Sequence, residues 1–157
     1  MKIKGIIAED FINYKIPSMV IEFPYCDLKC DKECGYSVCQ NSEILKAPVY
    51  DVPIQNIVKF YLGNDITKAL CLQGMEPCDS KDEMFRLIQA FRTFSDDDII
   101  IYTGYNKEEI PDVIKFVKHY KNIIIKFGRY IPNQTKHYDK ILGVTLASSN
   151  QYAEKIC

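Results

Sequence analysis

Short apolar runs alternate along this chain with amphipathic segments of helical spacing. The apolar runs of strand length are Ala69–Leu72, Ile99–Tyr102 and Ile123–Ile125. Between the first two, apolar residues recur at i, i+3, i+4 and i+7, at Met84, Leu87, Ile88 and Phe91. Strands that alternate with such helices through short loops predict βαβ units, right-handed crossovers and a parallel sheet.

Capping residues, prolines and glycines indicate further elements, and together the elements are predicted to form one domain, residues 1–157. The further elements predicted are a strand over Ile16–Phe23, a helix from Pro53 to Gly63, a capping box at Ser80–Glu83, a helix that starts at Asn106 with Glu109, and a fifth strand over Ile141–Leu146. Uninterrupted apolar runs are typical of strands covered on both faces. Five strands are too few for a closed eight-stranded barrel, so we expect an α/β fold with an open partial (β/α) barrel and a mostly parallel sheet. Its active face should lie at the carboxyl ends of the strands.

Composition and charge narrow the functional class. The chain has 157 residues, with 20 basic and 21 acidic side chains and a net charge of −1. This balance argues against a non-specific grip on nucleic acid or on an anionic membrane. The N-terminal residues 1–7 lack the apolar core of a signal peptide, and no run reaches the roughly 18 apolar residues of a membrane span. We therefore expect a cytoplasmic protein without nucleic-acid or membrane partners.

The cysteines are crowded into one loop. Of seven cysteines, four fall between positions 26 and 39, namely Cys26, Cys30, Cys34 and Cys39. In a cytoplasmic chain such crowding indicates metal or redox chemistry rather than a disulfide framework. Because the loop follows the first predicted strand, its thiols should lie on the active face. Of the others, Cys71 lies in an apolar run and is interpreted as a core residue.

Thiolates suit both iron–sulfur clusters and zinc, and the spacing leaves three sites open. An open cluster held by three of the thiols would leave one cysteine spare. A closed cluster held by all four would make the protein an electron carrier. A structural zinc site usually takes two separated pairs of ligands, whereas here all four cysteines share one loop. The two histidines, His119 and His137, lie in polar surroundings and are interpreted as surface residues. No side-chain triad or paired-carboxylate site is predicted.

The cysteine loop resembles that of the radical S-adenosylmethionine (SAM) family. Phe23-Pro-Tyr-Cys26, then Cys30, then Cys39-Gln-Asn41 is similar to the C-x₃-C-x₂-C loop and the following C-x-N of the activating proteins of anaerobic ribonucleotide reductases. The usual third position is occupied here by Glu33, so the loop is interpreted as expanded. The resemblance implies Cys26, Cys30 and Cys39 as cluster ligands, with Cys34 a close competitor for the third place.

Further segments agree with this family in the same order. Gly74-Met75-Glu76-Pro77 resembles its GGEP motif, Tyr102-Thr103-Gly104-Tyr105 its YTGY segment, and Gly128-Arg129-Tyr130 with Ala147–Gln151 its closing segments. The resemblance implies that the first two segments and Asn41 contact the cofactor, with the Glu76 carboxylate accepting hydrogen bonds from the SAM ammonium. Met75 and Phe127 depart from the family pattern.

The resemblance implies a radical SAM fold and a glycyl-radical-activating function. The cofactors would be a 4Fe–4S cluster and SAM, and the activity would be reductive cleavage of SAM to a 5′-deoxyadenosyl radical. The partners would be an anaerobic ribonucleotide reductase, on which a glycyl radical forms, and flavodoxin or ferredoxin as the electron donor. From the residues alone, a non-catalytic 4Fe–4S electron-transfer protein and a zinc-stapled binding module remain alternatives.

Overall fold

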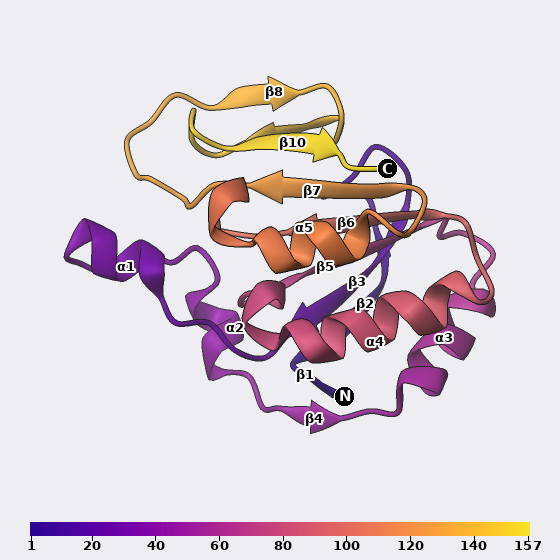
Figure 1. The fold of residues 1–157 in the computed structure, drawn as a ribbon. Helices are drawn as coiled ribbons and strands as arrows, with labels where there is room; N and C mark the ends of the chain where they lie inside the picture. Colours follow the sequence, from indigo (N-terminus) through magenta and orange to yellow (C-terminus); the bar gives the residue numbers. More distant parts are fainter.

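A six-stranded mixed sheet forms the body of the protein in the computed structural model, which describes residues 1–157 (Figure 1). Its strands lie in the order β10-β7-β6-β5-β3-β2. The four central strands are parallel, and the edge strands β2 and β10 run antiparallel to their neighbours. The bounds are β2 Gly5–Asp10, β3 Ser18–Phe23, β5 Ala69–Gly74, β6 Asp98–Tyr102, β7 Ile123–Phe127 and β10 Tyr152–Lys155.

Helices and two small sheets complete the chain. The helices are α1 Lys29–Cys34, α2 Ser42–Lys46, α3 Ile54–Leu62, α4 Lys81–Arg92 and α5 Pro111–Val117, with 3₁₀ turns η1 Pro77–Ser80 and η2 Lys107–Glu109. Strands β1 Lys2–Ile3 and β4 Tyr50–Asp51 pair with each other, as do β8 His137–Asp139 and β9 Val144–Leu146. Helix α1 projects from the body of the molecule and buries none of its residues (Figure 1).

The two faces of the sheet are covered differently. Helices α3, α4 and α5 pack on one face, where 23 buried residues form the larger apolar core. A smaller apolar cluster of nine residues lies on the opposite face, under the chain around Tyr14 and the segment from Leu142 to Leu146. Alternation along the strands divides the two clusters, since Leu70 and Leu72 belong to the first and Cys71 to the second. We call these the helix face and the open face.

The structure confirms the predicted α/β class and the mostly parallel sheet. The strands predicted at 69–72, 99–102 and 123–125 are present, and the central residues of β6 and β7 are buried. The prediction of a fifth sheet strand over Ile141–Leu146 is wrong, because only Val144–Leu146 is extended and it pairs with β8 outside the main sheet. Instead β10 pairs with β7. Its short sequence, Tyr-Ala-Glu-Lys, lacks the apolar run of a central strand because it lies at an edge.

Two predicted helix starts differ in detail. The Ser80 side chain makes no capping hydrogen bond, because η1 precedes α4 without a break and Glu76 caps that turn by accepting a hydrogen bond from the Cys78 amide. Asn106 and Glu109 do form a capping box, but it opens only the 3₁₀ turn η2. Pro111 restricts the residue before it and then starts α5 as its first residue.

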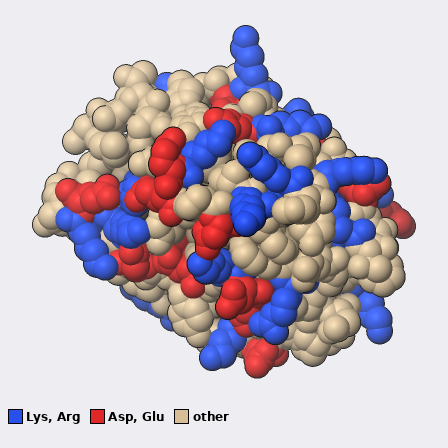
Figure 2. All heavy atoms as spheres, in the orientation of Figure 1, with Lys and Arg blue, Asp and Glu red and all other residues tan.

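The surface carries charges of both signs. In the view of Figure 2, Lys and Arg side chains alternate with Asp and Glu side chains rather than gathering into a field of one sign, as the near-neutral composition predicts. None of the helices has both the length and the apolar character needed to cross a membrane.

Candidate functional site

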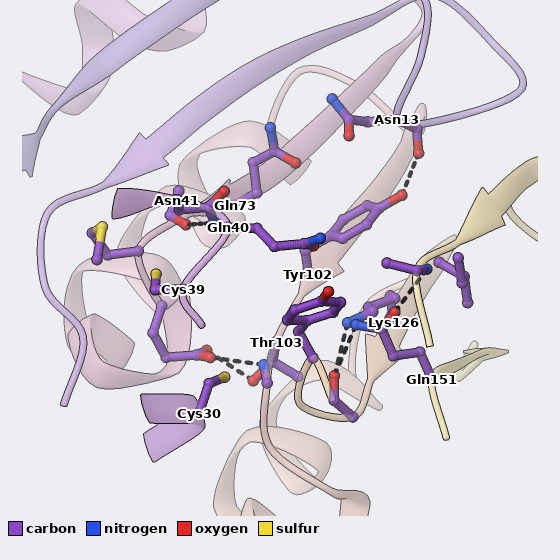
Figure 3. Close-up of a pocket in the computed structure, with 18 of the residues that line it drawn as sticks. Asn13, Cys30, Cys39, Gln40, Asn41, Gln73, Tyr102, Thr103, Lys126 and Gln151 are labelled. Carbon is purple, nitrogen blue, oxygen red and sulfur yellow. Dashed lines mark hydrogen bonds between the residues drawn. The ribbon is translucent and has the colours of Figure 1, made fainter. Parts of the chain in front are cut away.

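A cavity of about 300 Å³ lies on the open face, at the carboxyl ends of the parallel strands (Figure 3). Ten of the residues proposed from the sequence as ligand contacts line it: Cys26, Cys30, Cys39, Asn41, Gly74, Met75, Glu76, Tyr102, Thr103 and Gly104. Cys34, Pro77 and Tyr105 do not. Segments far apart in sequence therefore meet at one place, as expected where parallel strands end at a common edge.

Three strands each place a polar side chain on the floor of the cavity. Gln73, Tyr102 and Lys126 lie at or near the ends of β5, β6 and β7. Tyr102 and Lys126 are paired in the sheet register, and Gln73 follows the pair Leu72 with Ile101. The Tyr102 hydroxyl donates a hydrogen bond to the Asn13 carbonyl at 2.5 Å.

Gln73 and Lys126 were not predicted from the sequence as residues of the site. The pattern of their strands could have indicated them, because each is a polar residue at an alternate position where the other alternate residues are apolar.

Glu76 ties the ends of β5 and β6 together from within the protein. Its carboxylate accepts hydrogen bonds from the Cys78 amide at 3.0 Å, from the Thr103 hydroxyl at 2.8 Å and from the Gly104 amide at 2.8 Å. The residue is only 5% exposed, and burial raises the pKa of its carboxyl group while the three hydrogen bonds oppose that rise. Three of about four acceptor positions are filled, which leaves one for a group in the cavity.

Gly74 lets the end of β5 lie close to the end of β3, just before the cysteine loop begins. Its φ of +104° suits glycine, and a Cβ atom there would lie 2.6 Å from the backbone nitrogen of Phe23. The carbonyl of Gly74 accepts a hydrogen bond from the Asn41 side chain at 2.7 Å. Asn41 thus fixes the end of the cysteine loop to β5 as well as lining the cavity.

The loop itself is held by its acidic residues. One oxygen of Asp31, Oδ1, accepts hydrogen bonds from the amides of Val38 at 2.8 Å and Cys39 at 2.9 Å. These bonds fold the segment after α1 back, so that Cys39 reaches the cavity on the same side as Cys30 (Figure 3). Cys34 is the last residue of α1, one helical turn further along the chain than Cys30, and it does not line the cavity.

Burial disfavours the thiolate form of two of the cavity cysteines, Cys26 and Cys30. Burial and the nearby carboxylates of Glu76, Asp79 and Asp27 raise the pKa of Cys26 to about 12, although the Leu28 amide donates a hydrogen bond to its sulfur at 3.3 Å. Burial also raises the pKa of Cys30, against a hydrogen bond from the Tyr130 amide. A metal that binds here must displace the thiol protons, so metal binding would release them to solvent.

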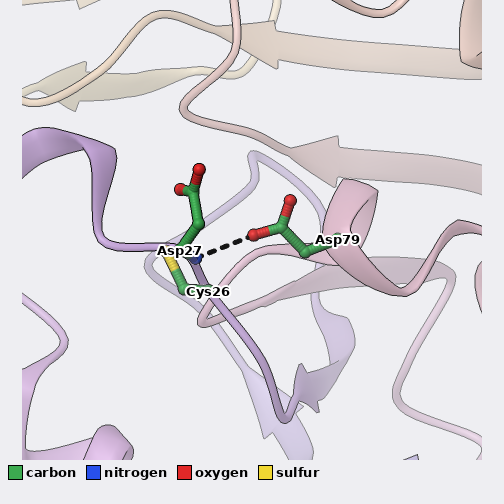
Figure 4. A group of neighbouring side chains, drawn as sticks. All are labelled: Cys26, Asp27 and Asp79. Atoms are coloured by element: carbon green, nitrogen blue, oxygen red, sulfur yellow. Dashed lines mark hydrogen bonds between the residues drawn. The ribbon is translucent and has the colours of Figure 1, made fainter.

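The loop thiols do not form a compact group in this structure. Four thiolates around zinc at about 2.3 Å lie about 3.8 Å from one another. No three of the loop thiols lie within 4.8 Å of one another. The side chains that do gather so closely are those of Cys26, Asp27 and Asp79 (Figure 4). Asp79 is already occupied, since it accepts hydrogen bonds from the Asp27 amide at 2.9 Å and the Tyr105 hydroxyl at 2.6 Å. We interpret this group as a brace for the loop.

Tyr105 and Arg129 form a second brace outside the cavity. The Lys29 ammonium lies 3.9 Å from the centre of the Tyr105 ring. Arg129 donates two hydrogen bonds to Glu109, at 2.6 and 2.8 Å, and lies 3.2 Å from a carboxylate oxygen of Glu33 in α1. Tyr105 therefore contacts Lys29 at the start of α1 and does not line the cavity, whereas the resemblance implied that it contacts the cofactor.

The C-terminal segment closes the far wall of the cavity. The Gln151 side chain accepts hydrogen bonds from the amides of Ala147 and Ser148 at 3.0 and 3.2 Å. The Asn150 side chain donates to the Arg129 carbonyl at 2.8 Å. Residues 144–147 and the N-terminal residues Ile12 and Asn13 also line the cavity. Apart from Ala147, which belongs to a segment that resembles the family, these residues were not predicted as part of the site, since no local pattern shows that they fold over the sheet.

Searches for similar proteins identify no relative. Neither a protein-family model, nor a curated protein, nor a solved structure matches this chain.

Proposed function

We propose that this chain is a radical SAM iron–sulfur enzyme that activates a glycyl radical partner. The observation that carries the proposal is the grouping of Cys26, Cys30 and Cys39 around one cavity, with Cys34 outside it. Three thiols at a cavity, with no fourth, suit a 4Fe–4S cluster that keeps one iron open for a ligand. A closed four-cysteine cluster would need Cys34 at the same place.

The sheet topology supports an open partial barrel of the radical SAM type. The strands β3, β5, β6 and β7 follow one another in space in chain order, and their connecting helices cover one face. Right-handed crossovers that always advance in one direction give this one-sided arrangement, as in a (β/α) barrel. A doubly wound sheet reverses its order and carries helices on both faces.

Different residues of the cavity would bind the cluster and SAM. Cys26, Cys30 and Cys39 would hold the cluster, which when bound supplies the electron that cleaves the S–C5′ bond of SAM and yields a 5′-deoxyadenosyl radical. Glu76 would accept a hydrogen bond from the SAM ammonium in its remaining acceptor position. Tyr102 and the segment 144–147 would shield the reacting centre from water.

The mouth of the cavity fits a macromolecular partner. Ile12 lines the cavity and is 77% exposed, and the neighbouring Phe11 is 64% exposed. An apolar rim of this kind would be covered by a protein that offers a glycine backbone to the cavity, which on the proposed function is an anaerobic ribonucleotide reductase. Flavodoxin or ferredoxin would deliver the electron.

The deciding experiment is anaerobic reconstitution with iron and sulfide, followed by electron paramagnetic resonance of the dithionite-reduced protein with and without SAM. We expect a cluster signal that shifts on addition of SAM. Serine variants of Cys26, Cys30 and Cys39 should each lose nearly all of the signal, whereas the matched control Cys34→Ser should keep it. A signal that is indifferent to SAM and is lost in Cys34→Ser would instead indicate a closed electron-transfer cluster. Tight zinc binding without iron uptake would contradict both.

Glu76 offers an independent test of the SAM site. Because Glu76→Gln keeps the size of the side chain but removes its charge, we expect SAM affinity to fall roughly tenfold or more. Equilibrium dialysis with the reconstituted protein measures this, with Glu108→Gln as an exposed control. Unchanged SAM binding and cleavage in Glu76→Gln would remove the ammonium-binding role from this residue.

A further inference from the structure

One buried apolar residue, Met75, packs in neither core of the protein. It is 8% exposed. Every other buried apolar side chain belongs either to the larger cluster on the helix face or to the smaller cluster on the open face. Met75 instead lines the cavity, together with Cys26, Cys30 and Cys39. The packing of the sheet therefore gives no reason for a methionine at this position.

The backbone at Met75 is close to both ends of the cysteine loop. The Met75 amide donates a hydrogen bond at 3.1 Å to the carbonyl of Phe23, which ends β3 just before the first cavity thiol. The carbonyl of the preceding residue accepts a hydrogen bond at 2.7 Å from the side chain of Asn41, just after the last cavity thiol. Because the loop leaves and returns at this point, Met75 lies where the loop meets the sheet.

A thioether suits the kind of metal that a thiol cavity binds. Methionine sulfur is a soft donor, and thiolate and thioether ligands both favour iron–sulfur clusters and other thiophilic metals. Its side chain is unbranched with three rotatable bonds, so it can adjust to a metal without movement of the backbone. Because the thioether is neutral, it would add a ligand without adding negative charge beside the buried carboxylate of Glu76.

We propose that the Met75 thioether is a fourth sulfur ligand of the metal centre held by Cys26, Cys30 and Cys39. For a 4Fe–4S cluster this rests on the proposed function: Met75 would bind the open iron while SAM is absent. A neutral thioether is a weak ligand, so it can leave when SAM arrives. The family motif has glycine at this position, so the ligand would be particular to this chain.

The test is X-ray absorption at selenium in protein made with selenomethionine. Of the four methionines, Met19 and Met84 are fully buried in the larger core, and Met1 lies outside the cavity. We expect an iron neighbour at one of the four selenium atoms of the reconstituted wild type, and none in Met75→Leu. Leucine keeps the volume of the side chain and removes the donor. The matched control Met84→Leu, also a buried methionine, should retain the iron neighbour.

Cadmium separates this ligand from the proposed function. Cd²⁺ is a soft ion that binds thiolates and thioethers without sulfide or a reductant, so it tests Met75 in the metal-free protein even if no cluster forms. We expect a cadmium neighbour at selenium in the wild type and in Met84→Leu, but not in Met75→Leu. If cadmium binds in this way and no iron is taken up, Met75 is upheld as a ligand and the radical SAM function is contradicted.

Addition of SAM to the iron-loaded protein tests the same distinction. We expect SAM to remove the iron neighbour from selenium. If the neighbour remains and SAM does not bind, Met75 is upheld as a permanent ligand of a closed cluster and the proposed function is contradicted.

Two outcomes would overturn the proposal itself. Selenium with carbon neighbours only, in the iron-loaded and the cadmium-loaded wild type alike, would leave Met75 as part of the cavity wall. A metal neighbour that persists in Met75→Leu would assign the ligand to another methionine.

Discussion

The two faces of the central sheet use the same strands for different purposes. On the helix face, the apolar core continues to the strand ends, where Leu72, Ile101 and Phe127 are fully buried. On the open face, the apolar cluster stops before the carboxyl ends of the strands, where Gln73 and Lys126 lie. Helices cover the first face, whereas loops from both ends of the chain cover the second.

The helix face therefore mainly determines the stability of the fold, and the end of the open face mainly determines what the cavity binds. A side chain on the helix face loses contacts on every side when it is shortened, because helices and strands enclose it. A polar side chain at the end of the open face borders a cavity, so its removal changes what the cavity binds more than whether the sheet forms. Substitutions at matched positions on the two faces can test this separation.

The largest contrast is expected between two adjacent residues of β5. Leu72→Ala, on the helix face, should lower the free energy of unfolding by about 2–5 kcal/mol through lost burial and the remaining cavity. Gln73→Ala, on the open face, should change it by less than about 1 kcal/mol. Urea denaturation measures both. Similar losses in the two variants would show that the open face is as tightly packed as the helix face.

A second pair compares two glycines that border the cavity. Gly74→Ala forces a positive φ on alanine and brings its Cβ within 2.6 Å of Phe23, so the free energy of unfolding should fall by roughly 2–3 kcal/mol. At Gly104 an added Cβ would meet the nearest atom, Oε2 of Glu76, at 3.5 Å, an ordinary contact. Thermal unfolding should therefore show Gly104→Ala close to wild type. A destabilised Gly104→Ala would mean that the space between Gly104 and Glu76 does not accommodate a methyl group.

The smallest effect concerns the ion pair between Arg129 and Glu109, outside the cavity. The Arg129 guanidinium lowers the pKa of Glu109 to about 2. This pair contributes stability that is fully present above the unfolded carboxyl pKa of about 4.3 and is lost as the pH falls through about 2. Because the Glu109 side chain is 35% exposed, solvent screening reduces the contribution to about 1 kcal/mol.

Glu109→Gln should accordingly be less stable than wild type at neutral pH by that amount, and the difference should vanish in acid. Urea denaturation between pH 7 and pH 2 follows it, with the exposed neighbour Glu108→Gln as the control. A difference that stays constant with pH would mean that the side chain acts through packing and not through its charge.

The accuracy of sequence-based prediction here follows the range of the interactions involved. The strands at 69–72, 99–102 and 123–125 and the helix stripe from Met84 to Phe91 were predictable, because period and burial are local signals. The edge strands β2 and β10 were not, since an edge strand needs no apolar run and is defined by its neighbour. The predicted strand at 141–146 shows the opposite error, an apolar segment whose partner lies outside the sheet.

The candidate site shows the same limit. Spacing within the loop allowed either Cys34 or Cys39 as the third cavity thiol. Only the fold separates them, because Asp31 turns the chain after α1 and carries Cys39 to the cavity. Likewise the basic stretch from Lys115 to Arg129 suggested a solvated surface, whereas Lys126 is buried and lines the cavity.

By itself, the sequence determined the α/β order, the parallel core and the crowding of thiols and glycines at strand ends, since these follow from hydrophobic period and backbone freedom. The tertiary structure alone decided which face carries the cavity, which thiols reach it and which lysine is buried beside it. Those outcomes depend on contacts between residues tens of positions apart, such as Asn41 with Gly74 and Asn13 with Tyr102, and no local pattern encodes such contacts.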